Sequence, residues 1–177
     1  MEQNPATIKK GNNVTISPFA RIYCESLEIG DNVRIDDFCI LTGKIKLGSN
    51  IHIGCFGFLC GGHGIELEDC VQVSGRVSFY SASDDYSGHS LVGPMMSDEY
   101  KPGMETGFVL IKKHALIGSN SLVMPGRTLG EGCAIGAYSF VNKDIPDWEI
   151  WVGRPIKYLS KRSKDMLNFP IPTNFTR

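Results

Sequence analysis

The sequence predicts an all-β fold in which short parallel strands wind into a solenoid, and three observations lead to this prediction. Apolar residues recur every six positions, glycine is frequent at 20 of 177 residues, and the repeat is interrupted twice at the same point of its period. A helix repeats its apolar positions at three and four residues and a strand at two, so a period of six indicates a short strand followed by a corner. Three hexads make a triangular coil of about 18 residues, and coils stack at the ~4.8 Å spacing of paired strands.

The six-residue period runs through two blocks of the chain. Its aliphatic positions are Ile29, Ile35, Leu41, Leu47, Ile53 and Leu59, then Ile111, Ile117, Val123, Leu129, Ile135 and Val141. A weaker first coil precedes them through Val14, Ile16 and Ile22. The fifth position of the hexad is often small or β-branched, and Arg127 departs from this pattern for no reason visible in the sequence.

Two insertions interrupt the period. The step from Leu47 to Leu67 is twenty residues instead of eighteen, with the surplus in 60–64. About 26 further residues, roughly 83–107, are added before Ile111. Both insertions follow the third hexad of a coil, so we expect them to leave the solenoid at one corner, one coil apart. Insertions in solenoids gather on the binding face, and the active site is therefore predicted at this corner.

Beyond the second block the period stops. Pro146 and Pro155 exclude regular structure across them, and the basic, amphipathic stretch 156–168 predicts a short C-terminal helix. We expect residues 1–155 to form the solenoid domain. Residues 156–177 are expected to form a capping helix and tail that cover the open end of the stack.

The composition excludes several classes of partner. Eighteen basic and nineteen acidic residues leave a formal net charge of -1, which provides no bulk field for nucleic acid or a membrane surface. No run approaches the ~18 apolar residues of a membrane span, and the N-terminus lacks the apolar core of a signal peptide. The six cysteines lack CxxC spacing, so reduced and mostly buried thiols are expected. The sequence therefore predicts a cytoplasmic protein without nucleic-acid or membrane partners.

The stretch IGSNSLVMPGRTLGEGCAIGAYSFVNKDIP and the VGRPIKYL that follows resemble the hexapeptide-repeat acyltransferases, the family of galactoside, maltose and serine acetyltransferases. The resemblance covers about residues 29–161. It implies a left-handed β-helix. The left hand comes from the resemblance alone, since a period shows no handedness and parallel crossovers are right-handed by default. It also implies acetyl-coenzyme A as co-substrate, no metal, and a homotrimer with active sites between neighbouring subunits.

The loop sequence YSASDDYSGHSLVGPMMSDEY resembles that of sugar O-acetyltransferases from surface-polysaccharide clusters. This resemblance implies transfer of an acetyl group from acetyl-coenzyme A to a sugar hydroxyl. Galactoside acetyltransferases carry a catalytic histidine followed by proline at the start of the loop, whereas this chain has Asp84 and Asp85. The family's usual base is therefore absent from its usual place.

The galactoside acetyltransferase pattern also implies where coenzyme A binds. It matches four residues here to cofactor-contacting positions, namely Ser119, Ala137, Asn142 and Lys143. Gly118 and Gly136 keep the neighbouring backbone bare for the pantetheine arm, although these small residues can also serve only the corners. Arg162 belongs to a basic cluster near the C-terminal end that fits the phosphates of the nucleotide, although such a cluster is also typical of a solvated surface.

Two histidines, His63 and His89, lie in the two insertions. A hydroxyl acceptor needs a base of near-neutral pKa, and imidazole is the side chain that has one. We predict His63 as the base, oriented by Asp84 or Asp85 from the next coil, with His89 as the alternative. Asp85 and Tyr86 are candidate contacts of the sugar. The competing interpretation is that His63 fills a glycine-rich corner and the aspartates cap the loop.

Three other functions remain open. N-acetylation of a nucleotide-linked amino sugar would explain the missing histidine, because a neutral amine is nucleophilic enough to dispense with a protein base. A γ-type carbonic anhydrase shares the solenoid and holds zinc with three histidines, but the histidine spacing here does not resemble that ligand set. A non-catalytic assembly scaffold is the third alternative.

Overall fold

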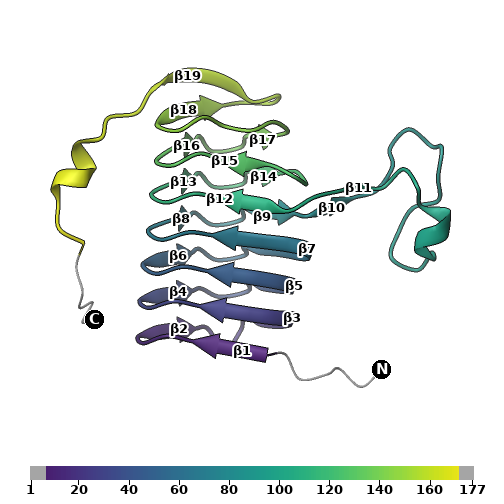
Figure 1. The fold of residues 1–177 in the computed structure, drawn as a ribbon, viewed down its shortest axis with the longest axis horizontal. Helices are drawn as coiled ribbons and strands as arrows, with labels where there is room; N and C mark the ends of the chain where they lie inside the picture. Colours follow the sequence, from purple (N-terminus) through teal and green to yellow (C-terminus); the bar gives the residue numbers. More distant parts are fainter. Residues whose placement is uncertain (1–6, 172–177) are drawn as a thin grey trace.

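The computed structural model describes residues 7–171, which form a triangular stack of coils with one protruding loop and a C-terminal arm (Figure 1). The near strands of Figure 1 run from right to left while the coils rise from β1 towards β15. A turn of this sense is left-handed. The protein is therefore an all-β, left-handed parallel β-helix, as the sequence and its resemblance predict.

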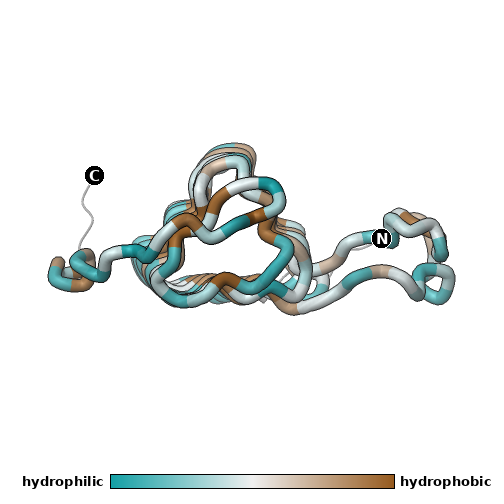
Figure 2. The backbone as a smooth tube through the Cα atoms, turned by 90° about the horizontal axis from the view of Figure 1, so that it is seen from above, coloured by the Kyte–Doolittle hydropathy of each residue, from teal (hydrophilic) through white to brown (hydrophobic). Residues whose placement is uncertain are grey.

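Each coil has three faces, which Figure 2 shows end-on as the sides of a triangle. Three long strands bend from the first face to the second, namely β3 (Arg21–Ile29), β5 (Ile40–Leu47) and β7 (Phe58–Leu67). The first face is completed by β9 (Ser78–Tyr80), β14 (Leu122–Val123) and β17 (Phe140–Val141). The second is completed by β1 (Thr7–Lys10), β12 (Val109–Ile111) and β15 (Thr128–Leu129). The third comprises β2 (Val14–Ile16), β4 (Val33–Ile35), β6 (Ile51–Ile53), β8 (Gln72–Val73), β13 (Leu116–Ile117), β16 (Ala134–Ile135) and β18 (Glu149–Val152).

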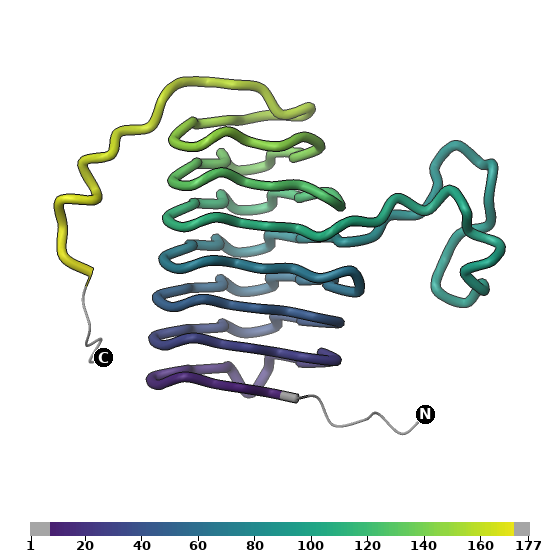
Figure 3. Tube along the Cα trace, in the orientation of Figure 1, coloured from purple at the N-terminus to yellow at the C-terminus, as the bar shows by residue number. Residues whose placement is uncertain are grey.

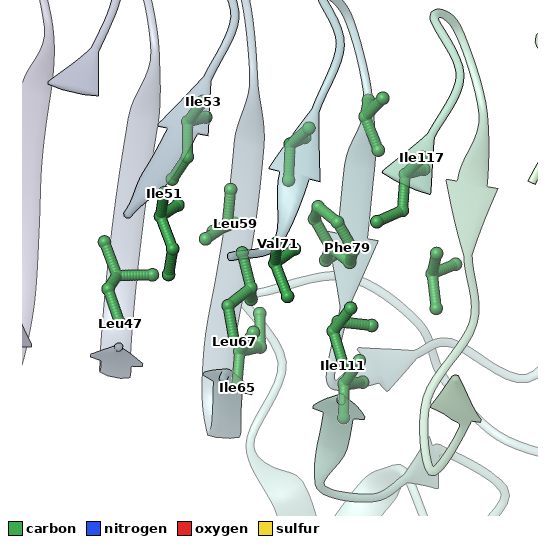
Figure 4. Packing of buried hydrophobic residues seen from close by; sticks show 14 of the residues in the cluster. Leu47, Ile51, Ile53, Leu59, Ile65, Leu67, Val71, Phe79, Ile111 and Ile117 are labelled. Atoms are coloured by element: carbon green, nitrogen blue, oxygen red, sulfur yellow. The ribbon is translucent and has the colours of Figure 1, made fainter. Parts of the chain in front are cut away.

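The interior is filled by the hexad positions. All twelve predicted aliphatic residues are buried, none of them more than 5 % exposed. Parallel register stacks equivalent side chains on successive coils, so that Leu47 pairs with Leu67 and Leu67 with Ile111 (Figure 4). Burying an aliphatic side chain of this size contributes about 1.5 to 3 kcal/mol, which is why the six-residue period specifies the fold.

Both insertions leave the corner between the first and second faces, as predicted, and we call this the insertion corner. Gly43 of β5 lies opposite Gly61 of β7, and Ile45 lies opposite Ile65, so the surplus residues of β7 bulge between two registered segments. The long loop leaves one coil higher, through an antiparallel stem of β10 (Ala82–Ser83) and β11 (Glu105–Thr106). Figure 3 traces this loop away from the coils and back, and Figure 1 draws the short 3-10 helix η1 (Asp98–Tyr100) in its outer part.

Arg127, which the hexad pattern leaves unexplained, holds the stem of this loop. Its Nη2 lies 2.7 Å from Oε1 of Glu105 in β11, and its Nε donates to the carbonyl of Pro125 at 2.9 Å. Beside it, a Cβ on Gly107 would lie 2.6 Å from the Cα of Gly126. The returning chain therefore passes close beneath the next coil, and the arginine ties the two together.

The end of the solenoid differs from the sequence prediction. The helix predicted over 156–168 is confined to the 3-10 turn η2 (Asp165–Asn168), and β19 (Lys157–Lys161) pairs antiparallel with β18. The physical reason is the open edge of β18, whose unpaired backbone groups a strand satisfies and a helix does not. The predicted tail beyond residue 171 lies outside the described residues.

Candidate active site

His63 projects from the insertion corner with an exposed side chain. Its backbone N–H donates to Oγ of Ser81 at 2.9 Å, and that hydroxyl donates to the carbonyl of Cys60 at 2.8 Å. Ser81 is completely buried and lies at the foot of the long loop. Gly64 completes the bulge with a φ of +94°, and a Cβ there would lie 2.7 Å from the Phe108 ring. The bulge and the loop are thus joined on consecutive coils.

The predicted pairing of His63 with Asp84 or Asp85 is not formed. No hydrogen bond joins His63 to either carboxylate within residues 7–171. Asp98 is the loop carboxylate whose pKa depends on His63. Its pKa is lowered chiefly by the hydrogen bond and charge of Lys101, and to a smaller extent by the charge of His63. Nζ of Lys101 lies 2.8 Å from Oδ1 of Asp98. The long loop therefore faces His63 with an acidic group that already has a partner.

Asp85 organises the loop. Its Oδ1 accepts the N–H of Ser87 at 2.7 Å and the Ser87 hydroxyl, while Oδ2 accepts the N–H of His89 and the hydroxyl of Ser90, both at 3.0 Å. These bonds, led by those from Ser87, hold the pKa of Asp85 far below its usual range. The Ser87 hydroxyl also lies 2.6 Å from Nδ1 of His89. The interpretation that an aspartate caps the loop is thus correct for Asp85.

Two other predicted loop residues are free to meet a ligand. Asp84 is exposed and makes no side-chain hydrogen bond within the described part of the chain. The side chain of Tyr86 is 93 % exposed, which places an aromatic ring almost entirely in solvent. Neither side chain is held by a hydrogen bond or ion pair among the described residues.

A second corner, between the third and first faces, carries a column of exposed aromatic rings, and we call it the aromatic corner. The rings of Phe38 and Phe56 stack with centroids 5.0 Å apart, and Phe19 continues the column at 5.7 Å. The guanidinium of Arg76 lies 5.3 Å from the centroid of Phe56 on the next coil. Higher up, the same corner carries Tyr138.

The candidate pantetheine strip lies on the aromatic corner, above Arg76. Ser119 and Ala137 occupy consecutive coils, since the N–H of Tyr138 donates to the carbonyl of Ser119 at 2.9 Å. Within residues 7–171 the N–H groups of Ser119 and Ala137 have no acceptor. A Cβ on Gly118 would lie 2.5 Å from the Ala137 nitrogen, and one on Gly136 would lie 2.5 Å from a side chain of the next coil. The glycines therefore serve coil packing, and the same packing leaves two free donors side by side.

The other predicted cofactor residues lie elsewhere. Asn142 and Lys143 are exposed at the insertion corner, two coils above the loop, and Nζ of Lys143 lies 6.0 Å from the ring centroid of Trp151. The first face separates them from Ser119 and Ala137.

Arg162 lies at neither of these corners. Its Nη1 donates to the carbonyls of His114, Gly132 and Cys133 at 2.9 to 3.0 Å, and desolvation lowers the pKa of Arg162. Its observed task is to anchor the C-terminal arm to the corner between the second and third faces.

Two hollows in the described residues lie away from the insertion corner and the aromatic corner. One, of about 480 Å³, lies between the C-terminal arm and the coils beside Arg162, and the other, of about 440 Å³, lies on the third face beside His52. Among residues 7–171 there is no group of three or more histidine, cysteine or acidic side chains arranged to hold a metal, and no helix with the length and apolarity of a membrane span. Apart from Arg162, which lines the first hollow, the candidate residues lie on the surfaces of the insertion corner and the aromatic corner.

Comparison with known proteins identifies the family. No family model matches the sequence. The chain is 41 % identical over 161 residues to the dTDP-4-amino-4,6-dideoxy-D-glucose acyltransferase of Escherichia coli, covering 89 % of this chain and 83 % of that protein. The chain belongs to the hexapeptide-repeat acyltransferases. It is also 26 % identical over 140 residues to a putative lipopolysaccharide biosynthesis O-acetyl transferase of Escherichia coli.

Solved structures of other acyltransferases are also similar to this chain. The N-acyltransferase AntD of Bacillus cereus, solved with dTDP-4-amino-4,6-dideoxyglucose and coenzyme A, is 42 % identical with a TM-score of 0.87, covering 90 % of this chain and 86 % of that one. AntD has also been solved with dTDP and 3-hydroxybutyryl-CoA, at 43 % identity and a TM-score of 0.87. A maltose O-acetyltransferase of Clostridium difficile, at 21 % identity and a TM-score of 0.58, shares the fold.

The sequence reasoning missed the aromatic corner. Phe19, Phe38 and Phe56 are spaced by nineteen and eighteen residues, which is the coil period, and this spacing alone predicts an aromatic column. It also missed Asp98 and Lys101, for which the irregular loop sequence provides no periodic signal.

Proposed function

We propose that this acyltransferase moves an acyl group from a coenzyme A thioester to the amino group of a dTDP-linked 4-amino-4,6-dideoxy sugar. The observation that supports it is the 41 % identity, over most of both chains, to an acyltransferase of that substrate. An amine acceptor replaces the sugar hydroxyl that the loop sequence implies. It also accounts for the missing histidine, because a neutral amine attacks a thioester without prior removal of a proton.

In the proposed reaction the amine nitrogen attacks the thioester carbonyl, the C–N bond forms, and the C–S bond breaks. The free N–H of Ser119 is placed to donate to the oxyanion of the tetrahedral intermediate. The proton that the nitrogen loses ends on the coenzyme A thiolate, so an amide and a free thiol result. The pantetheine arm runs along Gly118, Ser119, Gly136 and Ala137, while Asn142 and Lys143 meet the nucleotide end.

Asp84 is the proposed partner of the amine. Crystal structures of AntD carry substitutions at a serine and at an aspartate that lie ten residues apart in that chain. Ser74 and Asp84 have this order and spacing here, and both side chains are without hydrogen-bond partners in the described residues. A second pair, Ser26 and Asp36, has the same spacing, but Asp36 is engaged by Arg34 at 2.6 Å. An exposed carboxylate attracts an incoming ammonium. Once the ammonium has lost one proton to solvent, the carboxylate accepts an N–H of the free amine and orients its lone pair towards the thioester.

The proposed active unit is a homotrimer. Asp84 starts a loop that leaves the insertion corner and points away from its own coils, whereas Ser74 and Ser119 lie at the aromatic corner (Figures 1 and 2). The first face separates the two groups in one chain, so a second copy has to bring its loop to the aromatic corner. An interface between two different surfaces of identical chains forms a ring when the rotation between copies closes. The family resemblance implies a ring of three.

The test is turnover of defined acceptors. Release of free thiol from acetyl-CoA and 3-hydroxybutyryl-CoA should require dTDP-4-amino-4,6-dideoxyglucose, and mass spectrometry should show the acyl group on the sugar nucleotide. dTDP-glucose, which has a hydroxyl at the same carbon, should not react. Turnover of the hydroxyl sugar without turnover of the amino sugar would restore O-acetylation and overturn the proposal.

A further inference from the structure

The turn Ser74-Gly75-Arg76, at the aromatic corner, presents three donors that the coils do not use. Within residues 7–171 the hydroxyl of Ser74 and the N–H of Gly75 have no hydrogen-bond partner, and the guanidinium of Arg76 forms no ion pair. The turn itself is held in place, since the N–H of Arg76 donates to the carbonyl of Cys55 at 2.9 Å and the carbonyl of Gly75 accepts the N–H of Asn120 at 3.2 Å. A fixed turn with three outward donors matches the chemistry of an anion site.

Arg76 is positioned by the aromatic column. Its guanidinium lies 5.3 Å from the centroid of Phe56, and the Phe56 ring stacks on Phe38 with centroids 5.0 Å apart. All three residues have a φ of 60°, so their side chains leave successive coils in the same direction. A planar guanidinium held on an aromatic face loses less freedom when it binds a phosphate than a free arginine does.

The charges around the turn favour an anion on Arg76. The acidic residues of the same corner, Asp36 and Asp37, lie two coils lower and are engaged. Asp36 pairs with Arg34 at 2.6 Å and with His52 at 2.8 Å, while Asp37 accepts the hydroxyl of Ser17. Among the described residues no carboxylate forms an ion pair with Arg76, and the acidic side chains of this corner already have partners.

The turn also lies at the right level for the acceptor. It is one coil below Ser119, about 4.8 Å away along the stack, and its coil is the one whose first face leads into the loop with Asp84. If the amine of the acceptor attacks the thioester beside Ser119, the sugar ring lies between Ser119 and Arg76. The diphosphate attached to the sugar then lies at the turn Ser74-Gly75-Arg76.

We propose that Ser74-Gly75-Arg76, backed by Phe56 and Phe38, is the binding site for the nucleoside diphosphate of the acceptor. Arg76 and the N–H of Gly75 bind the diphosphate, and the base lies lower along the corner against the half-exposed edges of the Phe56 and Phe38 rings. The acceptor thus runs along the aromatic corner with its sugar towards Ser119. This inference rests on the proposed function and adds its nucleotide site.

Calorimetry with dTDP, inorganic pyrophosphate and coenzyme A tests the site without turnover. Arg76→Gln should weaken both dTDP and pyrophosphate by about tenfold to a hundredfold, as expected for a lost charged hydrogen bond, and leave coenzyme A unchanged. Arg76→Lys keeps the charge but not the planar guanidinium, so its affinities for dTDP and pyrophosphate should lie between those of wild type and Arg76→Gln. Phe38→Ala should weaken dTDP but not pyrophosphate, because it removes only the surface under the base.

Arg154 provides a matched control. Its guanidinium lies 5.4 Å from the centroid of Tyr138, an equivalent stacked pair three coils higher on the same corner, and Arg154→Gln should leave the dTDP affinity unchanged. Equal dTDP affinity of wild type and Arg76→Gln would overturn this inference and leave the proposed function intact. A wild type that binds coenzyme A but no dTDP would overturn both. Loss of the wild-type mass in Arg76→Lys, measured by light scattering, would assign Arg76 to a subunit contact and overturn direct binding.

Discussion

Nη2 of Arg127 lies 2.7 Å from Oε1 of Glu105, and this ion pair joins the stem of the long loop to the coil above it. Glu105 is about half exposed, at 51 %, so the pair contributes at most about 1 kcal/mol to global stability. Its importance is local, because the loop carries Asp84 and the stem sets the direction in which it leaves the coils.

Arg127→Met should therefore loosen the loop while the solenoid keeps its stability. We expect faster amide hydrogen exchange over residues 83–106 and a higher KM for the acceptor, with Tm changed by no more than a few degrees. Lys9→Met, which breaks the exposed pair between Lys9 and Glu28, is the control and should leave loop exchange as in wild type. Unchanged exchange in Arg127→Met would show that the stem holds without the pair.

Asp85→Ala should unfold the loop locally at neutral pH. The carboxylate accepts from Ser87, His89 and Ser90, and these bonds hold its pKa below the usual range. A lowered folded-state pKa means that the contribution to loop order is complete above the unfolded value of about 4 and is lost as the pH falls below it. Chymotrypsin at pH 8 should cleave after Tyr86 much faster in this variant. Asp84→Asn, which removes no hydrogen bond between residues 7 and 171, should be cleaved like wild type.

His63→Ala distinguishes amine from hydroxyl chemistry. With an amino sugar as acceptor we expect kcat within about tenfold of wild type, because no base has to ionise the nucleophile, and the same holds for His89→Ala. A general base for a hydroxyl would contribute about 10² to 10⁴ in kcat. The kcat values of the two variants and wild type are compared by steady-state kinetics at a pH above the pKa of the amine, where the acceptor is already neutral. A hundredfold loss confined to His63→Ala would restore the histidine as base.

Ala137→Arg should block the cofactor strip. A long side chain at this position covers the free N–H groups of Ser119 and of residue 137, and binding of coenzyme A should weaken at least tenfold by calorimetry. Ala134→Arg, on the third face one strand earlier, introduces the same charge away from the strip and is the control. Equal affinities of both variants would place the pantetheine arm elsewhere.

Mixed assemblies of two variants test whether two copies of the proposed trimer share each site. Ala137→Arg damages the coil side and Asp84→Ala the loop side, so each variant alone should have low activity. Co-refolded at equal amounts, they form sites that join an intact corner of one copy to an intact loop of another, and about a quarter of wild-type activity should return. Activity no higher than the mean of the two variants would mean that each chain builds its own site.

Much of the fold follows from local periodicity. A hexad buries its aliphatic residue regardless of which coil lies above, so the twelve positions, the coil length and the common corner of the two insertions can all be read from the chain. The anchoring role of Arg127 is different, because its partner Glu105 lies across an irregular loop whose return path no period describes. The structure also separates the four predicted cofactor residues. Ser119 and Ala137 lie at the aromatic corner, whereas Asn142 and Lys143 lie at the insertion corner.

The sequence by itself determined the β-helix, its core and the place where the loop leaves. Only the tertiary structure decided that the C-terminal stretch pairs as β19, that Asp85 is engaged within the loop, and that Arg76 lies on Phe56 with unpaired donors beside it. The physical reason is the range of the interactions. Burial of a repeated side chain is specified within six residues, whereas edge pairing, loop hydrogen bonds and stacking across coils depend on groups that only the folded stack brings together.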